Sequence, residues 1–325
     1  MVELLKKLMF TQGVSGREDK ICEVIKKEVE PYCDEVTVDA VGNLIAHKKG
    51  NGKKIMFGAH MDEIGYFATH IEKNGNIKLH SVGGINYTSS AFGTVVSERG
   101  VYGALVQRAG DDSPKEDNVY IDIGAKTEKQ ARSKVKIGDV FVTAPSIKRL
   151  MGTRYIGRPF DDRAGCLVLI EALKAVKQTD NDLYFVFTTQ EEVGSRGARP
   201  ATYGIAPDIA IAVDVTRADD KGTQQKLNID LGKGPTIKIK DGSVICSSEL
   251  LAEMRRIADE NGVKYQDEML SDGGTDTSVM QIAGKGCKAG AISLPCGYIH
   301  TCNEMIDLND IKGAIRLATL ICERI

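Results

Sequence analysis

Acidic residues and histidines stand close to the ends of several short apolar segments of this sequence. They are His60 and Asp62 at the end of "IMFGAHMD", Glu191 and Glu192 after "YFVFTTQ", Asp214 after "IAIAV", His300 after "AISLPCGYI", and Asp161 and Asp162 at the start of the helical segment "DDRAGCLVLIEALKAVK". Apolar segments of this length predict buried strands. Since open α/β sheets bind their ligands at the carboxyl ends of the strands, the sequence predicts one crevice in which these side chains meet.

A cluster of this composition would bind divalent metal ions. Several carboxylates in one crevice cannot all be ionised at pH 7 unless a positive charge compensates them, and divalent cations supply that charge. A mixture of imidazole and carboxylate ligands suits Zn²⁺, Co²⁺ or Mn²⁺, whereas Ca²⁺ and Mg²⁺ favour oxygen alone. Two histidines and several carboxylates are enough for two ions about 3.5–4 Å apart that share a ligand, the usual hydrolytic arrangement.

Each of these residues has a simpler interpretation when it is considered alone. His60 could be a hydrogen-bonded core histidine, Asp161 and Asp162 could cap the helix that follows them, and Glu191 and Glu192 could form a solvated strand end. In the same way, Asp214 could cap a turn and His300 could lie on the surface. Their joint occurrence at the ends of apolar strands favours the metal site, because water cannot stabilise so many charges where burial is expected.

The elements that must position these residues fall into two groups along the chain. Strands alternate with helices in residues 1–65 and 155–325, which predicts a layered α/β domain. Residues 66–154 consist mainly of short alternating or β-branched runs separated by glycines, which predicts a compact all-β barrel or sandwich. The α/β domain is therefore expected to be discontinuous, with an all-β insertion between its halves.

One helix is expected to begin near residue 15. Ser15 and Glu18 have the spacing of a capping box, and Ile21, Ile25 and Val29 would then lie on one apolar face.

Composition argues against several classes of protein. The 325 residues are 42% hydrophobic and 27% charged with a net charge of −2, a globular composition without an electrostatic footprint for nucleic acid or a membrane surface. No segment approaches the roughly 20 apolar residues that span a bilayer. We expect "MVELLKKLMF" to form an amphipathic helix, since it lacks the apolar core and cleavage site of a signal peptide. Eight scattered cysteines without a C-x-x-C pair are expected to be reduced thiols. These features predict a cytoplasmic protein with no nucleic-acid or membrane partner.

Five motifs, in this order along the chain, resemble the M42 family of metallo-aminopeptidases. They are "AHMDEIG", "FDDRAGC", "QEEVGSRGA", "VDVT" and "YIHT". The resemblance covers nearly the whole chain, including "SDGGTDTSVMQ" near residue 275, a loop expected to line the substrate pocket. Relatives are often called glutamyl aminopeptidases or endoglucanases. Gly297 stands ahead of "YIH", where members commonly carry an arginine, which bears on substrate specificity.

The resemblance implies two metal ions per subunit, Zn²⁺ or Co²⁺ with Mn²⁺ as another candidate. His60, Asp161 and Asp214 would hold one ion. Asp161 would bridge to the second ion, which Glu192 and His300 would also hold.

The resemblance also implies how the reaction proceeds. Glu191 would be the general base that activates a water shared by the two metals, and Asp62 would orient His60. The substrate would be a short peptide with a free N-terminus, which loses its first residue. In the family the peptide bond after the bridging aspartate is cis, so the same is expected between Asp161 and Asp162.

At the level of the fold, the resemblance implies a zinc-exopeptidase-like mixed sheet flanked by helices. The insertion, residues 66–154, resembles the family's dimerisation domain, and relatives assemble into tetrahedral shells of twelve subunits. A homo-oligomer of this kind is therefore expected. The alternative is that the insertion only decorates a monomer.

The same residues allow three other functions to be considered. A related metal-dependent deacylase or carboxypeptidase could use the same metals on a different amide. A β-glucan hydrolase needs only two carboxylates, but this chain has no tryptophan and only 6% aromatic residues with which to stack sugar rings. A non-catalytic binding protein would not need the complete set of proposed ligands and the base Glu191.

Overall fold

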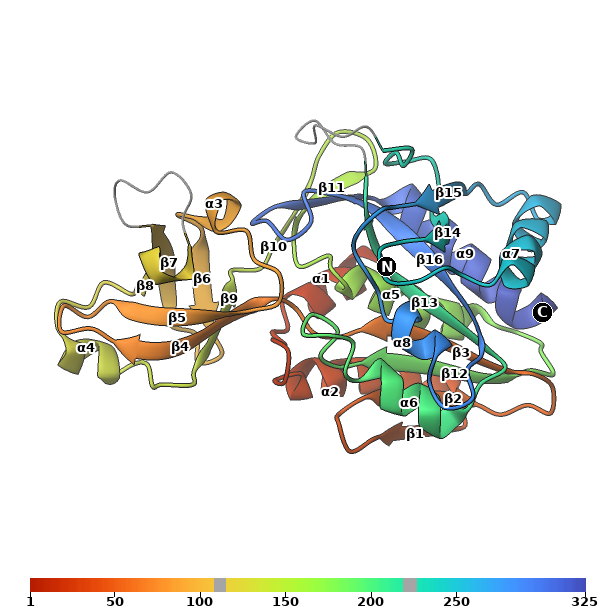
Figure 1. Cartoon of the computed structure of the whole chain (residues 1–325), viewed down its shortest axis with the longest axis horizontal. Coiled ribbons are helices and arrows are strands. Elements are labelled where there is room, and N and C mark those ends of the chain that lie inside the picture. The colour runs from red at the N-terminus through yellow and green to blue at the C-terminus, as the bar shows by residue number, and fades with distance from the viewer. Residues whose placement is uncertain (108–114, 219–226) are drawn as a thin grey trace.

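The computed structural model describes residues 1–107, 115–218 and 227–325. In it a large mixed sheet with flanking helices lies beside a smaller β-barrel, and the barrel forms a separate lobe at the left of Figure 1. The arrangement confirms the predicted fold class, an α/β fold interrupted by an all-β barrel.

Among the described residues, eleven strands form the large sheet, in the order β1-β2-β12-β3-β13-β16-β17-β11-β10, with β14 paired to β16 and β15 paired to β14. Their bounds are β1 Glu35–Val38, β2 Leu44–Lys48, β3 Lys54–His60, β10 Ser146–Arg149, β11 Arg154–Arg158, β12 Asp182–Thr188, β13 Ile209–Arg217, β14 Thr236–Lys240, β15 Gln266–Met269, β16 Lys288–Gly297 and β17 Glu304–Asp307. The four central strands, β12, β3, β13 and β16, run parallel, and the strands outside them on this path are antiparallel to their neighbours.

Helices cover both faces of the large sheet. One face packs against α1 Val2–Met9, α2 Asp19–Val29, α5 Arg163–Ala175, α7 Ser248–Glu260 and α9 Leu308–Arg324, and the other against α6 Ala198–Ile205 and α8 Thr277–Gln281. In β3, Ile55 and Phe57 join the core of the first face whereas Met56 joins the core of the second. This alternation with a period of two explains why the central strands are apolar along their whole length.

Six strands close the barrel in the order β4-β5-β8-β7-β6-β9 within the described part of the chain. They are β4 Gly65–Ile71, β5 Ile77–Val82, β6 Thr94–Ser97, β7 Tyr102–Gln107, β8 Val119–Asp122 and β9 Val140–Thr143. The short helices are α3 Tyr87–Ser90 and α4 Glu128–Arg132, with 3₁₀ turns η1 Glu30–Tyr32 and η2 Glu116–Asn118. The barrel has its own apolar core, and a smaller cluster that includes Val14 and Val140 joins it to the α/β part.

The start of α2 differs from the prediction. The helix begins at Asp19 rather than near residue 15, Glu18 is its N-cap, and the Glu18 side chain makes no cap hydrogen bond. The predicted capping box is therefore wrong, because the side chains of Ser15 and Glu18 make hydrogen bonds to distant parts of the chain instead. By contrast, α5 is capped by an acid as expected, since Asp162 accepts a hydrogen bond from the backbone N–H of Gly165.

No helix in the three described stretches is long and apolar enough to cross a membrane. All eight cysteines are free thiols.

Candidate metal centre

The register of the parallel strands brings the predicted residues to one edge of the sheet. Thr188 at the end of β12 pairs with His60 at the end of β3, so Glu191 and Glu192 follow just beyond that edge. In β13, Asp214 lies two residues beyond Ala212, the partner of Gly58 in β3. The crevice at the carboxyl ends of these strands is the ligand site that an open α/β sheet predicts.

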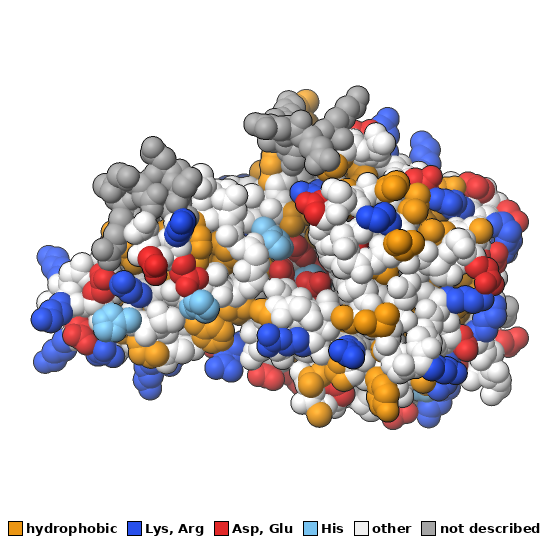
Figure 2. Space-filling view, viewed as in Figure 1, with side chains coloured by type: hydrophobic (Ala, Val, Ile, Leu, Met, Phe, Trp, Pro, Cys, Tyr) orange, Lys and Arg blue, Asp and Glu red, His pale blue; other side chains and the backbone are white. Residues whose placement is uncertain are grey.

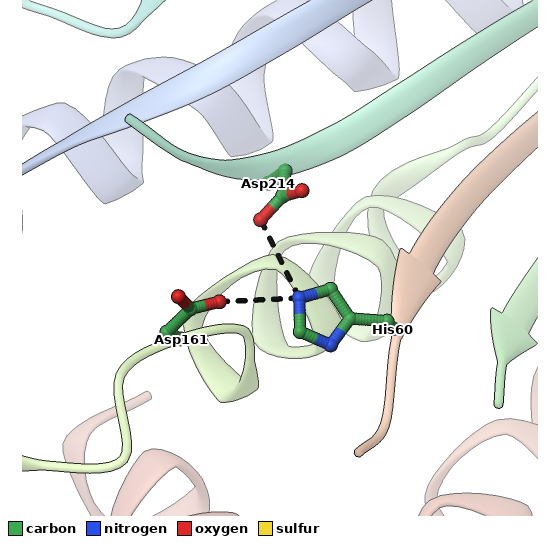
Figure 3. Close-up of side chains that lie close together, drawn as sticks. All are labelled: His60, Asp161 and Asp214. Atoms are coloured by element: carbon green, nitrogen blue, oxygen red, sulfur yellow. Dashed lines mark hydrogen bonds and ion pairs between the residues drawn. The ribbon is translucent and has the colours of Figure 1, made fainter. Parts of the chain in front are cut away.

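His60, Asp161 and Asp214 form the first group of potential ligands, which we call the His60 group (Figure 3). The Nε2 atom of His60 lies 3.1 Å from Asp161 Oδ1 and 3.6 Å from Asp214 Oδ1. All three residues are buried, and one potential ligand atom of each lies within 4.8 Å of the others. Three donors from three segments thus converge on one point.

Asp161, Glu192 and His300 form a second such group, the His300 group. His300 Nε2 lies 3.1 Å from Asp161 Oδ2 and 3.4 Å from Glu192 Oε1. Asp161 faces His60 with one carboxylate oxygen and His300 with the other, so its carboxylate stands between the two groups. The peptide bond from Asp161 to Asp162 is cis, as the resemblance implies.

Asp62 lies behind the His60 group and is fully buried. Its Oδ1 is 3.4 Å from the Nδ1 atom of His60, on the far side of the ring from Asp161. The same carboxylate accepts hydrogen bonds from the backbone N–H groups of Glu191 (3.0 Å) and Glu192 (3.2 Å). Asp62 therefore contacts both the imidazole and the loop that carries the two glutamates.

A cavity of about 300 Å³ opens beside these residues. Its lining includes Glu191, the five residues of the two groups, and Asp272 to Thr275 of the loop that was expected to line the pocket. Figure 2 shows this hollow near the junction of the two lobes, with acidic and histidine side chains in it. Glu191 and both groups therefore face one space.

Both imidazoles are placed among acids. Burial alone would lower the pKa of His60, but hydrogen bonds with Asp161, Asp214 and Asp62 outweigh it and raise that pKa well above its usual value. Burial is likewise outweighed at His300, where Asp161 and Glu192 raise the pKa to about 11. Without metal ions, protonated imidazoles would be the nearest positive charges for these carboxylates.

The pKa values of the carboxyl groups are shifted in different directions, according to the neighbours of each group. Burial raises the pKa of Glu191 well above its usual value, and the negative charge of Asp214 raises it further. Burial also raises the pKa values of Glu192 and Asp214. For Asp161, hydrogen bonds with His300 and His60 outweigh burial and lower the pKa below its usual range. The crevice holds more carboxylate than its imidazoles can neutralise.

The donor set fits divalent cations. Each group offers one imidazole nitrogen and two carboxylates, the mixture that Zn²⁺, Co²⁺ and Mn²⁺ accept. Asp62 stands on the far ring nitrogen of His60, where metal-binding histidines commonly have a carboxylate or carbonyl partner.

A buried ion pair beside the site was not predicted from the sequence. Arg158 Nη1 donates to Glu304 Oε1 (2.9 Å), and Glu304 Oε2 accepts from the backbone N–H groups of Phe160 (2.6 Å) and Asp161 (3.2 Å). The pair is assembled by strand pairing between β11 and β17, where Gly157 lies opposite Glu304. Glu304 lies 146 residues from Arg158, and no local spacing links the two.

Asp276 was also missed as a buried acid near the site. Its Oδ2 accepts a hydrogen bond from the hydroxyl of Thr188, and burial raises its pKa to about 6. Its position within a glycine-rich loop, rather than after an apolar strand, concealed it.

The chain is similar in sequence to known aminopeptidases. The family model of the M42 glutamyl aminopeptidases matches residues 42–317. A putative aminopeptidase of Acetivibrio thermocellus is 42% identical over 98% of this chain and 97% of its own length. A lysyl aminopeptidase of Pyrococcus furiosus is 33% identical over 99% of this chain and 97% of its own length.

Solved structures of peptidases are also similar to this chain. An aminopeptidase from the archaeon Desulfurococcus kamchatkensis superposes with a TM-score of 0.96 at 34% identity, covering 100% of this chain and 94% of that one. A TET peptidase of Pyrococcus horikoshii that can assemble into a tetrahedron or an octahedral shell gives 0.90 at 33% identity, covering 100% and 99%. An endoglucanase of Thermotoga maritima gives 0.84 at 32% identity, covering 98% and 96%.

Proposed function

The chain belongs to the M42 peptidase family and is a peptide hydrolase, and we propose that it is a di-metal aminopeptidase with Glu191 as its general base. The observation that carries the proposal is the position of Asp161 between two groups of potential ligands, with Glu191 in the same cavity. The proposed ligands are His60, Asp161 and Asp214 for one ion, and Asp161, Glu192 and His300 for the other.

The chain's own residues would divide the work of the reaction. When bound, the cations would polarise the scissile carbonyl and make water acidic enough to lose a proton near neutral pH. Glu191 would accept that proton and later deliver it to the leaving amine. Burial of Glu191 raises its pKa, which strengthens the carboxylate as a proton acceptor. Asp62 would hold the His60 ring and the Glu191 backbone in place.

We propose a short peptide with a free N-terminus as the substrate. A cavity of about 300 Å³ has room for one side chain and its neighbouring backbone, rather than a folded protein. Aminoacyl-p-nitroanilides with each type of side chain, tested after loading with Zn²⁺, Co²⁺ or Mn²⁺, would identify the preferred residue. Matched N-acetylated substrates form the control. Cleavage of the blocked substrates alone would favour a deacylase, and cleavage from the C-terminus would favour a carboxypeptidase.

Glu191→Gln tests the proposed base. The amide keeps the size of the side chain but cannot take up a proton, so we expect kcat to fall about 10²- to 10⁴-fold. Metal content, measured by elemental analysis, should stay equal to that of the wild type because Glu191 is not among the proposed ligands. If the variant hydrolyses peptides as fast as the wild type, Glu191 is not the base.

Hydrolysis of β-glucan is the second candidate, because one structural neighbour carries the name endoglucanase. The described residues that line the cavity include no tryptophan, tyrosine or phenylalanine on which a sugar ring could stack. We therefore expect no release of reducing sugar from carboxymethylcellulose. Hydrolysis of cellulose that survives a chelator, together with no hydrolysis of peptides, would replace the aminopeptidase assignment.

We further propose that residues 66–154 form the interface of a homo-oligomer, with a tetrahedral dodecamer as the expected assembly. Barrel-lobe residues Phe92, Tyr102 and Ile137 are between 52% and 73% exposed, so the lobe offers apolar side chains that a partner could cover. The TET peptidase neighbour assembles into a tetrahedron. Light scattering should give a mass near twelve times 35.2 kDa, and a monomer at micromolar concentration would refute the proposal.

A further inference from the structure

The loop that carries Glu191 and Glu192 is held by side chains from three distant parts of the chain. Thr189 donates its backbone N–H to Asn43 Oδ1 (3.0 Å), and Gln190 donates to Glu18 Oε1 (3.1 Å). The next two residues, Glu191 and Glu192, donate to the carboxylate of Asp62. Four consecutive backbone donors are thus each satisfied by a side chain outside the loop.

This loop needs such support because its backbone is strained. Gln190 has φ +56° and Ser195 has φ +53°, and residues with side chains rarely adopt this left-handed region. A strained conformation persists only where the surroundings determine it. The hydrogen bond from Gln190 to Glu18 lies directly at the first strained residue, one position before Glu191.

Ser15 and Glu18 supply this support from the segment before α2. Glu18 Oε1 accepts from Gln190 and also from the backbone N–H of Gly16 (2.8 Å), so one oxygen joins the N-terminal segment to the loop. Ser15 Oγ donates to Asp62 Oδ2 (2.6 Å), the same oxygen that accepts from Glu192. Both residues are 6% exposed. Their side chains therefore serve the loop rather than the helix that they precede.

We propose that Glu18 is a positioning residue for Glu191 and acts through the backbone of Gln190. Ser15 would contribute to the same positioning through its hydrogen bond to Asp62. The inference rests on the proposed role of Glu191 as the base. Glu18 is not among the described residues that line the cavity, so a role in catalysis would be exerted through the loop rather than by contact with a substrate held there. It also lies before residue 42, where the match to the family model begins, so that match assigns it no role.

The function of Glu18 is that of a hydrogen-bond acceptor, and this separates two substitutions. In Glu18→Gln the amide oxygen can still accept from both Gly16 and Gln190. In Glu18→Ala no acceptor remains, and the two backbone donors lose their partner. Glu18→Met likewise lacks an acceptor but keeps most of the side-chain volume, and it takes the place of the alanine variant if that variant does not fold.

Hydrogen exchange and kinetics together test the proposal. In Glu18→Ala we expect the amides of residues 190–192 to exchange about tenfold faster, since one hydrogen bond contributes roughly a factor of ten. We expect kcat to fall about 10- to 100-fold, as small displacements of a reacting group do, with KM nearly unchanged. Glu18→Gln should restore both quantities to within about threefold of wild type.

Ile21→Val is the matched control for stability. Ile21 is fully buried in α2, three residues from Glu18, so the shorter side chain should lower the melting temperature without reaching the loop. We expect wild-type kcat and wild-type exchange of residues 190–192 in this variant. If Ile21→Val changes them as much as Glu18→Ala does, general destabilisation explains the effect and the proposal fails.

Hydrogen exchange and kcat together distinguish a failure of the positioning role from a failure of the proposed function. Unchanged exchange and unchanged kcat in Glu18→Ala would overturn the positioning role. If the wild-type protein hydrolyses no peptide, the proposed function fails, and the exchange of residues 190–192 in Glu18→Ala and Glu18→Gln still decides whether Glu18 holds the loop.

Discussion

The two groups of potential ligands have the same chemistry but different surroundings. His60 is 3% exposed at the end of a central strand, and Asp161, Asp214 and Asp62 surround its ring. His300 has a side chain that is 31% exposed and lies in the segment between β16 and β17, with φ +61°. One histidine is thus part of the sheet and the other part of a loop.

From this difference we predict that the two proposed metal ions bind with different affinities. A ligand that is fixed by packing and by a carboxylate on its second nitrogen loses little freedom when a metal binds. A partly exposed ligand on a loop must be ordered at that moment. We therefore expect tight binding at the His60 group and weaker, exchangeable binding at the His300 group.

Asp161→Asn should have the largest effect, because Asp161 belongs to both groups of potential ligands. The amide removes the one carboxylate that both groups share, so we expect loss of both ions and a fall in activity of about 10³-fold or more. Elemental analysis and peptide hydrolysis measure the two effects. Retention of two ions per subunit would show that Asp161 does not connect the groups.

His60→Ala and His300→Ala compare the groups directly. Each substitution should lower activity about 10²- to 10³-fold. Each weakens the binding of one ion, and such an ion would stabilise the transition state by several kcal/mol. Calorimetric titration of the chelator-treated protein with Zn²⁺ should show a tight and a weak site in the wild type. The tight site should be lost in His60→Ala and the weak site in His300→Ala, and the reverse assignment would contradict the comparison.

Asp62→Asn changes a residue that contacts the His60 ring but is not itself a proposed metal ligand. The amide keeps the shape of the side chain but weakens its hold on the imidazole. We expect the affinity of the tight site to fall about 10- to 100-fold while the weak site changes less. Titration calorimetry separates the two sites. An equal loss at both sites would mean that Asp62 acts through the Glu191–Glu192 loop rather than through His60.

The pH dependence of stability should differ between the wild type and His300→Ala only in the metal-free protein. The pKa of His300 is raised from 6.5 to about 11 in the folded state, so the folded protein binds a proton there that the unfolded chain releases above pH 6.5. The stability from this residue is full below about pH 6.5 and is lost as the pH rises towards 11.

Thermal melting between pH 7 and 10 tests this expectation. The melting temperature of the metal-free wild type should fall more steeply with pH than that of metal-free His300→Ala. With metal bound the difference should vanish, since imidazole binds a metal in its neutral form. Parallel curves for the two metal-free proteins would show that His300 is not held protonated by Asp161 and Glu192.

Most of the fold could be predicted because it follows from local patterns. The apolar runs that became β3, β12, β13 and β16 are buried on both faces, so their sequences are apolar throughout and easy to recognise. The short alternating runs after residue 65 likewise became the strands of the barrel. Element type follows from such periodicity, whereas the order of strands in the sheet does not.

The capping box shows where local reasoning fails. Ser15 and Glu18 have the spacing that caps a helix, yet their side chains bond to Asp62 and Gln190. A buried carboxylate or backbone donor elsewhere in the chain competes for the same hydrogen bonds as the helix end. No property of residues 15 to 18 reveals that competition.

The candidate metal ligands could be identified from residue types and positions alone, because imidazoles and carboxylates at the ends of apolar strands are costly unless they have such a use. How these residues are grouped depends on the folded chain. Parallel pairing of β3 with β12 and β13 placed His60, Glu192 and Asp214 at one edge, and Asp161 came to lie between the two histidines from a different segment. Which carboxylate oxygen faces which imidazole ring depends on strand register and on packing between residues about a hundred positions apart in the chain. A local sequence pattern does not specify contacts between such distant residues.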